Sequence, residues 1–419
     1  MADRMYICID LKSFYASVEC ADRRLDPFKV NLVVADEKRG AGAICLAITP
    51  AMKALGIHNR CRLFEIPSGV KYITAMPRMK RYMEASAEIY SIYLRYFSEE
   101  DIHVYSIDEC FIDVTSYLSF YKKTPKELAV MLMQAVQEQT HICATAGVGT
   151  NMFLAKVALD ITAKHAPDHI GVLDEDSFRR TMWDHTPITD IWGIGKGTAA
   201  RLERLGAYTL HDVAILDEKV LYKTFGINAQ YLIDHANGRE PCTIADIRSY
   251  TARTQSLSHG QILFSDYDYH GALLVMKEMV DKLVLDLVAK KKVTNCVSLY
   301  VRYSRDIEKP TGTTKKLTAY TSSYSKIADA FERCYRSAVL DYAPIRAINI
   351  ALGDLADEEC AVTDLFTDPA AEEREHRMQE AILAIKNRYG KNAVLRAMSY
   401  QPGATARSRN KLIGGHNGE

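Results

Sequence analysis

The sequence lacks any pair of cysteines in a C-x-x-C arrangement, although it contains ten cysteines along the chain. Closely paired cysteines are the usual sign of a zinc site or a disulfide framework, so neither is predicted. No secretory leader is recognised at the N-terminus either. Free thiols without a leader favour a reducing cytoplasm as the location of the protein.

Long hydrophobic runs are also missing. The most apolar helical stretch, residues 273–288, is interrupted by Lys277, Glu278, Asp281, Lys282 and Asp286. A spanning helix needs about 20 consecutive apolar residues, so no membrane partner is expected. With 419 residues, 48% hydrophobic and 25% charged, the chain has an ordinary globular composition. Its length is enough for about two to four domains.

The chain as a whole has no net charge, with 53 basic and 53 acidic residues. The charge is unevenly divided, because residues 248–356 hold 16 Lys and Arg against 11 Asp and Glu, a net of +5. The remainder is therefore acidic by the same amount. A basic module beside an acidic one favours a protein that binds a polyanion and also keeps metal ligands, although surface variation alone can give such an excess.

Two segments place carboxylates inside apolar, strand-like runs: residues 9–15 and residues 106–113. Buried carboxylates are costly unless they are paired or bind a metal. If the two strands lie side by side, Asp10, Asp108 and Glu109 can converge and hold Mg²⁺ with a phosphate substrate. The alternative for Asp10 alone is a cap or a solvated strand edge. Asp113 alternates with Phe111 and is interpreted as structural.

The order of elements predicts an α/β or α+β core, since strand-like runs alternate with helical ones up to about residue 162. Residues 188–199 then join two short helices through a glycine hairpin. Together with residues 202–212, this resembles a helix-hairpin-helix unit, whose hairpin amides hold a DNA phosphate. The candidate DNA-binding residues are Gly193, Gly195, Lys196 and Gly197.

The C-terminal part contains strand-like stretches at residues 251–257, 295–302, 315–317 and 345–352. Gly260, residues 290–292 and residues 315–316 are candidate phosphate contacts, or simply a solvated face. After Asp357 the chain becomes acidic, a charged helix is predicted from about 370 to 388, and residues 403–419 are expected to be flexible.

Taken together, these segments resemble the Y-family of DNA polymerases, the translesion group, and within it the bacterial error-prone polymerases. The resemblance extends from Tyr6 to about Leu352 and is carried by motifs in a fixed order. They are residues 9–19, 106–113 and 146–158, the hairpin at residues 193–195, and residues 256–260.

This resemblance implies a template-directed DNA polymerase of low fidelity, active in DNA damage tolerance, with two Mg²⁺ ions. The catalytic carboxylates would be Asp10, Asp108 and Glu109, with the Leu11 carbonyl as an additional metal ligand. Tyr15 occupies the steric-gate position, where a ring below the sugar excludes a 2′-hydroxyl. The residues implied to bind the nucleotide are Ser13, Phe14, Tyr15, Thr49, Lys53 and Lys164.

Three positions depart from the family pattern. Lys12 replaces the usual acid or amide, Pro50 a usual aromatic residue, and Lys53 a usual arginine. The spacing from Lys156 to Lys164 is also one residue longer than expected. These departures predict a rearranged grip on the triphosphate.

The implied architecture is a right hand of α+β class. It has a palm (1–13 and 77–171), small fingers (14–76), a helix-hairpin-helix thumb (172–240) and a DNA-binding little finger (248–356). A tail follows (357–419). Within it, residues 362–366 resemble a clamp-binding peptide in which Leu365 and Phe366 enter an apolar groove, with Val362 in place of the usual glutamine. The expected partners are primer-template DNA, a deoxynucleoside triphosphate and a sliding clamp, on an otherwise monomeric chain.

Two other functions remain open at this stage. A nucleotidyl cyclase-like palm enzyme also uses paired carboxylates and two metals, but it needs neither the hairpin nor the basic module. A non-catalytic DNA-binding regulator with a palm-like fold would not need Asp10, Asp108, Glu109 and Tyr15 together.

Overall fold

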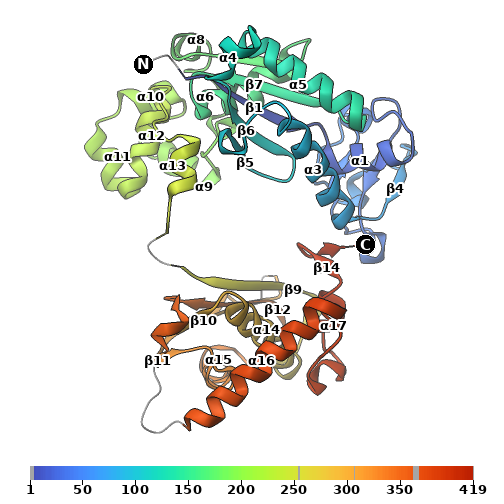
Figure 1. Ribbon diagram of the computed structural model, residues 1–419, viewed down its shortest axis with the longest axis vertical. Coiled ribbons are helices and arrows are strands. Elements are labelled where there is room, and N and C mark those ends of the chain that lie inside the picture. The colour runs from blue at the N-terminus through green and yellow to red at the C-terminus, as the bar shows by residue number, and fades with distance from the viewer. Residues whose placement is uncertain (1–3, 253–254, 306, 362–367, 419) are drawn as a thin grey trace. The chain divides into compact units, whose positions relative to one another are not determined.

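The computed structural model describes residues 4–252, 255–305, 307–361 and 368–418, and the chain divides into two compact units (Figure 1). The first comprises Met1–Tyr250 together with Asn417–Glu419, and the second comprises Thr251–His416. Each unit has its own sheet and its own hydrophobic core. The predicted multidomain α+β class is therefore confirmed.

The main sheet of the first unit is built around β1, which pairs antiparallel with β6 on one side and β7 on the other. The side chains of residues 6–9 are at most 1% exposed, as expected for a strand that is covered on both faces. The strand order is β5-β6-β1-β7-β8. Their bounds are β1 (Tyr6–Leu11), β5 (Ile102–Val104), β6 (Glu109–Asp113), β7 (Ala144–Gly149) and β8 (Ile170–Leu173).

Helical segments from two stretches of the chain accompany this sheet. α5 packs against β7 and β1, and α6 packs against the same two strands. The segments are α3 (Met79–Tyr93), α4 (Tyr117–Tyr121), α5 (Pro125–Thr140), α6 (Met152–Val157), a π-helical segment (Ala158–Thr162) and α7 (Ala163–His165). α6, the π-helical segment and α7 follow one another without a break, so one helical rod leads from Met152 to His165.

A smaller three-stranded sheet follows the first helix of the chain. Its order is β3-β2-β4, and a hydrophobic cluster that includes Val33, Ile48 and Met52 fills its interior. Pro50 begins α2 at the first helical position, where proline is favoured because its missing amide hydrogen has no helical partner to lose. The elements are α1 (Phe14–Asp22), β2 (Leu32–Val34), β3 (Ala47–Ile48), α2 (Pro50–Ala54) and β4 (Ile73–Ala75).

The end of the first unit is helical and has its own core, in which Phe153, Phe178 and Leu202 are fully buried. The helices are α8 (Glu175–Thr181), α9 (Lys196–Glu203), α10 (Leu210–Ile215), α11 (Glu218–Phe225), α12 (Ala229–Ala236) and α13 (Ile244–Ser249). Figure 1 shows α9 to α13 as a compact group.

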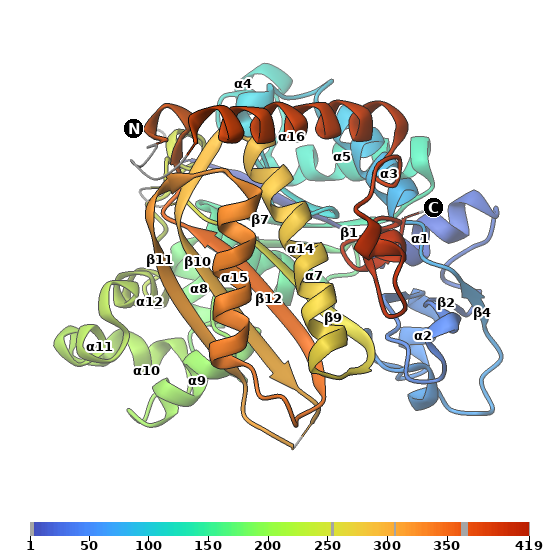
Figure 2. The ribbon, with the colours of Figure 1, turned by 90° about the horizontal axis from the view of Figure 1, so that it is seen from below.

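The second unit is an antiparallel sheet of order β11-β10-β12-β9 with two helices on one face (Figure 2). Strand β9 begins at Leu257, so the prediction of a strand at residues 251–257 was wrong. Ser258 and Gly260 lie on the open face of the sheet, so this part of β9 lacks the apolar residues from which a strand is predicted. The elements are β9 (Leu257–Tyr267), α14 (Tyr269–Ala289), β10 (Lys292–Tyr303), β11 (Thr311–Thr321), α15 (Tyr324–Ala338), β12 (Ile345–Gly353) and β13 (Ala356–Asp357).

The tail is folded, and the expectation that residues 403–419 are flexible was wrong for those that the structure describes. The carboxylate of Glu278, which is only 2% exposed, accepts bonds from the backbone amides of Thr405 (2.7 Å) and Ala406 (3.0 Å). Arg409 donates to the Gln261 side chain at 2.8 Å. A buried carboxylate requires such donors, so the tail completes the core of the second unit.

The tail also contains a long helix, α16, which packs against α14 (Figure 2). Its Glu375 carboxylate accepts bonds from the hydroxyl groups of Ser323 and Ser325 at the beginning of α15. The tail elements are α16 (Pro369–Tyr389), α17 (Ala406–Arg409), β14 (Leu412–Ile413) and β15 (His416–Asn417).

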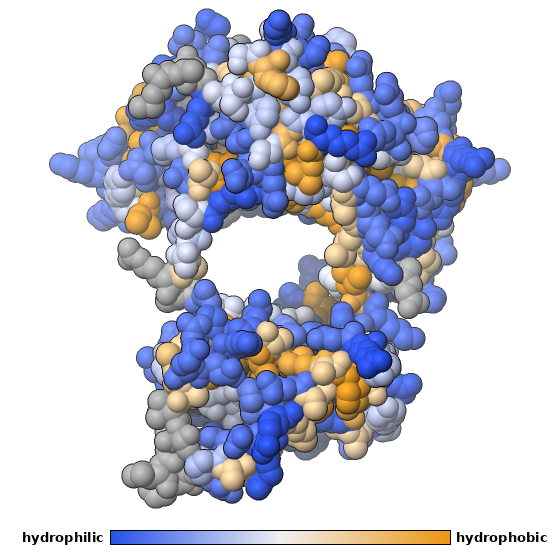
Figure 3. Space-filling model, viewed as in Figure 1, coloured by the Kyte–Doolittle hydropathy of each residue, from blue (hydrophilic) through white to orange (hydrophobic). Residues whose placement is uncertain are grey.

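Short 3₁₀ turns connect several of these elements. They are Glu37–Arg39, Leu63–Glu65, Glu99–Asp101, Ile188–Asp190, Gly226–Asn228, Glu358–Cys360 and Ala397–Tyr400. Within the described residues, no helix is both long enough and apolar enough to cross a bilayer. On the face shown in Figure 3, hydrophobic residues form only small, separate patches.

Candidate active site

The two acidic segments lie side by side, as the sequence predicts. In the antiparallel pairing of β1 with β6, Asp10 stands directly opposite Glu109. The backbone amide of Leu11 also donates to the carbonyl of Asp108 at 2.9 Å. Directly opposed residues place their side chains on the same face of the sheet, so these acids share one side of one strand pair.

The surroundings of Asp10 strongly raise the pKa of its carboxyl group. Burial, followed by repulsion from Asp108 and Glu109, raises the pKa of Asp10 to about 7, and Lys156 opposes the shift. Burial is the largest cause of this shift, and the two neighbouring carboxylates add to it. The charged form of Asp10 is therefore disfavoured in the free protein.

Lys156 is the one cation placed within ion-pair distance of these carboxylates in the described part of the chain. Its ammonium lies 2.7 Å from Glu109 Oε1 and 2.8 Å from Asp160 Oδ1, and the residue is only 7% exposed. Although burial lowers the pKa of Lys156, its bonds to Asp160 and Glu109 raise it above the ordinary value. Cys8 Sγ donates to the same Glu109 oxygen at 3.2 Å. Sequence reasoning included Lys156 in a motif but gave it no role, because a helical lysine alone carries no signal of burial.

Two glycines of β7 let α6 bring this lysine to the sheet. A Cβ atom at Gly147 would lie 2.0 Å from the carbonyl oxygen of Ala155, and one at Gly149 would lie 2.3 Å from the Ala155 amide. Both distances are far below van der Waals contact with backbone that cannot move aside. Glycine at 147 and 149 is therefore what allows Lys156 to reach Glu109.

The carboxylates are not yet arranged around a common point. Asp108 accepts a bond from the Ser106 hydroxyl at 2.7 Å, while Glu109 is turned to Lys156. Consequently, no group of three or more His, Cys, Asp or Glu side chains in the described ranges is gathered to hold a metal ion. The donors nevertheless suit Mg²⁺, since they are hard oxygens in a place with uncompensated negative charge. Asp113 has a structural contact, as expected, because it accepts bonds from the amide and hydroxyl of Thr115.

Tyr15 lies just after β1, near the beginning of α1. Its ring stacks on the ring of Tyr82 with centroids 4.5 Å apart and planes 14° from parallel. The hydroxyl of Tyr82 in turn donates to the buried Glu19 carboxylate at 2.7 Å. The stacking on Tyr82 and the bond from Tyr82 to Glu19 therefore fix the position of the Tyr15 ring. Tyr82 was missed by sequence reasoning because its position on α3 is far away in the chain.

The predicted nucleotide-binding residues near Tyr15 differ in burial and in hydrogen bonding. Ser13 has a left-handed backbone (φ 51°) at the N-cap of α1, and its hydroxyl oxygen is buried without a partner. Phe14 is buried in the core. Thr49 is fully buried, and its hydroxyl bonds to the Val30 carbonyl and the Leu32 amide. Both hydrogen bonds of the Thr49 hydroxyl are therefore made within the fold.

Lys53 and Lys164 come from distant parts of the chain but act on each other. Burial lowers the pKa of Lys53, Asp10 raises it, and the positive charges of Lys12 and Lys164 lower it again. The ammonium groups of Lys12 and Lys164 thus both lie close enough to Lys53 to act on its charge, and so does the Asp10 carboxylate. This juxtaposition was not evident from their spacing in the sequence.

A π-helical segment lies between Lys156 and Lys164, where the sequence predicts a spacing one residue longer than the family pattern. Residues Ala158–Thr162 form this wider turn between α6 and α7. A π-helical turn takes up one more residue than an α-helical turn over a similar rise. Lys164 is therefore presented near Lys53 despite the longer spacing.

Comparison with known proteins agrees with this arrangement. A model of the impB/mucB/samB family matches residues 9–160, and the model of that family's C-terminal domain matches residues 254–365. UvrX of Bacillus subtilis strain 168, whose name refers to UV-damage repair, is 30% identical, with 98% of this chain and 97% of that protein covered. The chain belongs to this family of Y-family DNA polymerases.

Further similarities extend over nearly the whole polymerase. Proteins named DNA polymerase IV 2 from Bacillus subtilis and Halalkalibacterium halodurans are 29% and 30% identical, each with 99% of both chains covered. A solved Y-family DNA polymerase chimera has the same fold, with a TM-score of 0.65 at 21% identity. The match covers 84% of this chain and 99% of that one. This membership decides against the cyclase-like and the non-catalytic alternatives.

The glycine hairpin of the polymerase precedes α9. Gly193 has a left-handed backbone (φ 87°), Gly195 is the N-cap of α9, and open space surrounds all three glycines of the hairpin. The preceding residue, Trp192, donates from its indole nitrogen to the Tyr105 hydroxyl at 3.0 Å. Since Tyr105 lies directly before the turn that carries Asp108, this bond joins the segment that leads into the hairpin to the segment that leads into the turn.

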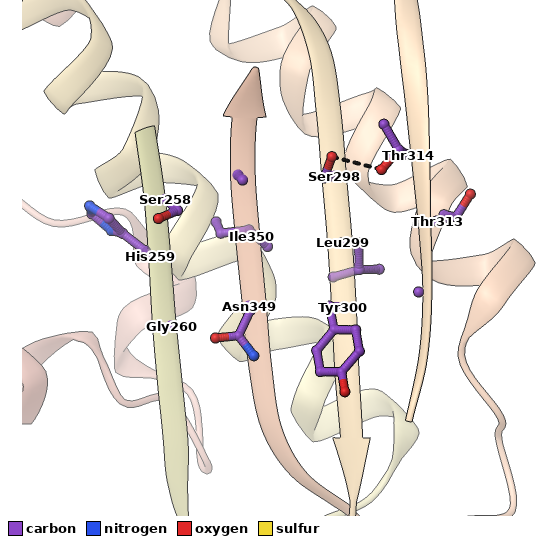
Figure 4. Close-up of a pocket in the computed structure, with 12 residues that line it drawn as sticks. Ser258, His259, Gly260, Ser298, Leu299, Tyr300, Thr313, Thr314, Asn349 and Ile350 are labelled. Atoms are coloured by element: carbon purple, nitrogen blue, oxygen red, sulfur yellow. Dashed lines mark hydrogen bonds between the residues drawn. The ribbon is translucent and has the colours of Figure 1, made fainter. Parts of the chain in front are cut away.

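The open face of the second unit carries a groove of about 640 Å³ (Figure 4). One row across the four strands consists of Gly260, Asn349, Tyr300 and Gly312, which stand opposite one another. The Asn349 amide oxygen would lie 2.4 Å from a Cβ atom at Gly260, and the Leu299 carbonyl oxygen would lie 2.7 Å from a Cβ atom at Gly312. The two edge glycines thus keep both ends of this uncharged row low, while the Tyr300 ring between them is about half exposed.

The lysines predicted to contact phosphates differ in their surroundings. Lys292 is paired with Asp357 at 2.6 Å, and Lys316 is at the limit of ion-pair distance, 4.0 Å, from Asp354. Lys292 is therefore a structural link between β10 and β13. Leu365 and Phe366, predicted to bind a clamp, lie outside the described residues.

Proposed function

We propose that the polymerase adds deoxynucleotides to a primer 3′-hydroxyl under the direction of a template, and does so opposite damaged bases. The observation that carries this proposal is the pairing of Asp10 with Glu109 next to Asp108, beside the supported ring of Tyr15. Acids with excess negative charge suit metal-assisted phosphoryl transfer, and an aromatic ring beside them suits selection of a sugar. The names of the relatives, DNA polymerase IV 2 and a UV-damage repair protein, support the same reaction on DNA.

In this proposal Asp10, Asp108 and Glu109, with the Leu11 carbonyl, would hold two Mg²⁺ ions. When bound there, the ions would lower the pKa of the primer 3′-hydroxyl and neutralise the triphosphate. Two other side chains hold these carboxylates in the free protein. Ser106 orients the Asp108 carboxylate, and Lys156 holds Glu109 and balances part of the acidic charge in the free protein.

Nucleotide selection would depend on Tyr15. A 2′-hydroxyl below the sugar would meet the ring, and the ring cannot retreat because Tyr82 stacks behind it. Lys53 and Lys164 would bind the triphosphate as point charges, and the amide groups at residues 13–15 would hold its oxygens. Replacing Tyr15 by Ala should reduce discrimination against ribonucleotides, while Tyr15→Phe should retain it. Equal discrimination in wild type and Tyr15→Ala would remove the gate from the proposal.

The resemblance to Y-family polymerases also supports an assignment of domain roles. We assign palm to residues 1–13 and 77–171, fingers to 14–76, thumb to 172–240, little finger to 248–356 and a tail to 357–419. The thumb hairpin and the groove floor of the little finger would both contact the DNA backbone. The small fingers sheet supports an open site with loose checking of base-pair shape, and hence low fidelity.

Clamp binding rests on sequence alone. Leu365 and Phe366 would enter an apolar groove of a sliding clamp and raise the local concentration of the polymerase at primer ends. Replacing both by Ala should leave basal extension intact and remove stimulation by the clamp. If stimulation stays the same, this segment has another role.

The decisive experiment is primer extension with Mg²⁺ on undamaged templates and on templates with an abasic site. The wild type should extend both, and Asp108→Ala should extend neither while still binding the primer-template. Absence of extension by folded wild type on either template would sink the proposed reaction. Extension of the undamaged template alone would remove only the damage-bypass part.

A further inference from the structure

Lys12 is the departure from the family pattern that the proposed reaction leaves without a role. Its backbone is fixed between β1 and α1, since its amide donates to the Cys143 carbonyl at 2.9 Å. Its own carbonyl accepts a bond from the Ser17 hydroxyl at 2.6 Å. The direction in which the Lys12 side chain leaves the backbone is therefore set by the fold.

The Lys12 side chain reaches toward the loop that follows α7. Its Nζ lies 3.5 Å from Nε2 of His169 and 5.5 Å from the centroid of the Phe28 ring. His169 comes five residues after Lys164 at the end of the same loop. Lys12 is thus half-buried against the segment that also presents a triphosphate lysine.

No carboxylate neutralises these lysines. In the described part of the chain, no Asp or Glu lies within the 4.0 Å ion-pair distance of Lys12, Lys53 or Lys164. The acids nearby are occupied or distant: Asp26 pairs with Lys29 at 3.5 Å, and Asp10 acts on Lys53 only at longer range. The positive charges of Lys12 and Lys164 both act on Lys53, which is unfavourable in the free protein, and a multivalent anion relieves that repulsion.

The residue after Lys12 provides a second indication of an anion. The Ser13 hydroxyl oxygen is buried and has no hydrogen-bond partner, although it belongs to the N-cap of α1. Buried hydroxyl groups are almost always paired, so an orphan one marks a place for a missing group. The first amides of α1 are also without helical partners, which favours an anion there.

We propose that Lys12 binds the phosphate chain of the incoming nucleotide as a third cation beside Lys53 and Lys164, and that it retains the pyrophosphate product by the same contact. The inference deepens the proposed function and rests on it for the identity of the nucleotide. It also explains the departures together: the grip loses an aromatic residue at Pro50 and a forked arginine at Lys53, and it gains a positive charge where relatives carry an acid or amide.

The test measures binding of inorganic tripolyphosphate to the full-length protein by calorimetry, without DNA or nucleotide. Lys12→Gln should weaken binding roughly three- to tenfold, Lys12→Asp should weaken it further, and Lys12→Arg should stay near wild type. Lys71→Gln, which removes an exposed lysine from the same part of the chain, should bind like wild type. Equal binding by wild type and Lys12→Gln would overturn the inference.

A second measurement distinguishes a binding role from a merely structural one. In primer extension, Lys12→Gln should raise the KM for the deoxynucleotide and the inhibition constant for pyrophosphate by similar factors, with unchanged affinity for primer-template. A change in DNA affinity with neither of these shifts would contradict the assignment. If the wild type binds tripolyphosphate through Lys12 but extends no primer, the proposed function fails while the polyphosphate site remains.

Discussion

The carboxylate site of the first unit and the groove floor of the second unit have opposite chemistry. Around Asp10, charged side chains are buried, paired at 2.7–2.8 Å through Lys156, and crowded enough to change their acidity. Across the groove, Gly260, Asn349, Tyr300 and Gly312 present no charge. Both are regions that we propose to contact the same substrate.

The difference follows from what each region must distinguish. A reaction at one phosphorus atom needs charge concentrated at one point, and the protein accepts an unfavourable cluster of acids to obtain it. Holding a uniform sugar-phosphate backbone needs a surface that favours no single position, because the strand must advance after each addition. An uncharged row that carries an aromatic ring, Tyr300, offers contacts that do not depend on the base sequence.

The largest effect is expected from the charged site. Asp108→Asn keeps the size of the side chain and its place beside Ser106 but removes a charge that the reaction requires. The rate of nucleotide addition should fall on the order of a thousandfold or more, with unchanged affinity for primer-template in a binding assay. A comparable loss of DNA affinity would show that the two regions are not separable in function.

Next in size is the buried ion pair. Lys156→Met leaves Glu109 without its cation in a nearly closed space, so the free energy of unfolding without metal should fall by about 3 kcal/mol. Lys126→Met breaks a pair of similar length with Asp168, 2.7 Å, but both side chains there are about half exposed. This control should lose less than about 1 kcal/mol in denaturant titrations. Similar losses for both variants would contradict the view that burial makes Lys156 special.

The third test is pH. Because the pKa of Asp10 is about 7 in the folded protein and 3.8 ordinarily, the folded state binds the Asp10 proton more tightly than the unfolded state. Its contribution to stability is therefore most favourable below pH 4 and is lost as the pH rises through 7. Metal-free wild type should lose about 2 kcal/mol more than Asp10→Asn between pH 4 and pH 8, after allowance for partial exposure. Parallel curves for the two proteins would refute the assignment.

The smallest effect is expected from the groove. Gly260→Ala would displace only the flexible end of Asn349, so folding should be unaffected and primer-template affinity should drop about two- to fivefold. Gly353→Ala on β12, where a Cβ atom has ordinary contacts at 3.6 Å from Cys296, is the matched control. Because the floor is uncharged, the drop should be the same at low and high salt. A salt-dependent drop would mean that the groove acts through charge after all.

Sequence reasoning succeeded where a pattern is local. The carboxylate pair could be predicted because each acid stands in an apolar run, and such runs become neighbouring strands. Lys156 could not be assigned a partner, since its burial depends on Gly147 and Gly149 in another element. The folded tail was missed for a similar reason, because its polar composition does not reveal the buried carboxylate of Glu278, more than a hundred residues earlier.

The π-helical turn at residues 158–162 has a consequence for how such chains diverge. An inserted residue in an ordinary α-helix rotates everything after it by about 100°, which would carry Lys164 off its face. A π-helical turn takes up one further residue within itself, so the residues after it keep their face of the helix. Such a turn would let a chain with the predicted longer spacing present Lys164 at the same place as a chain without it.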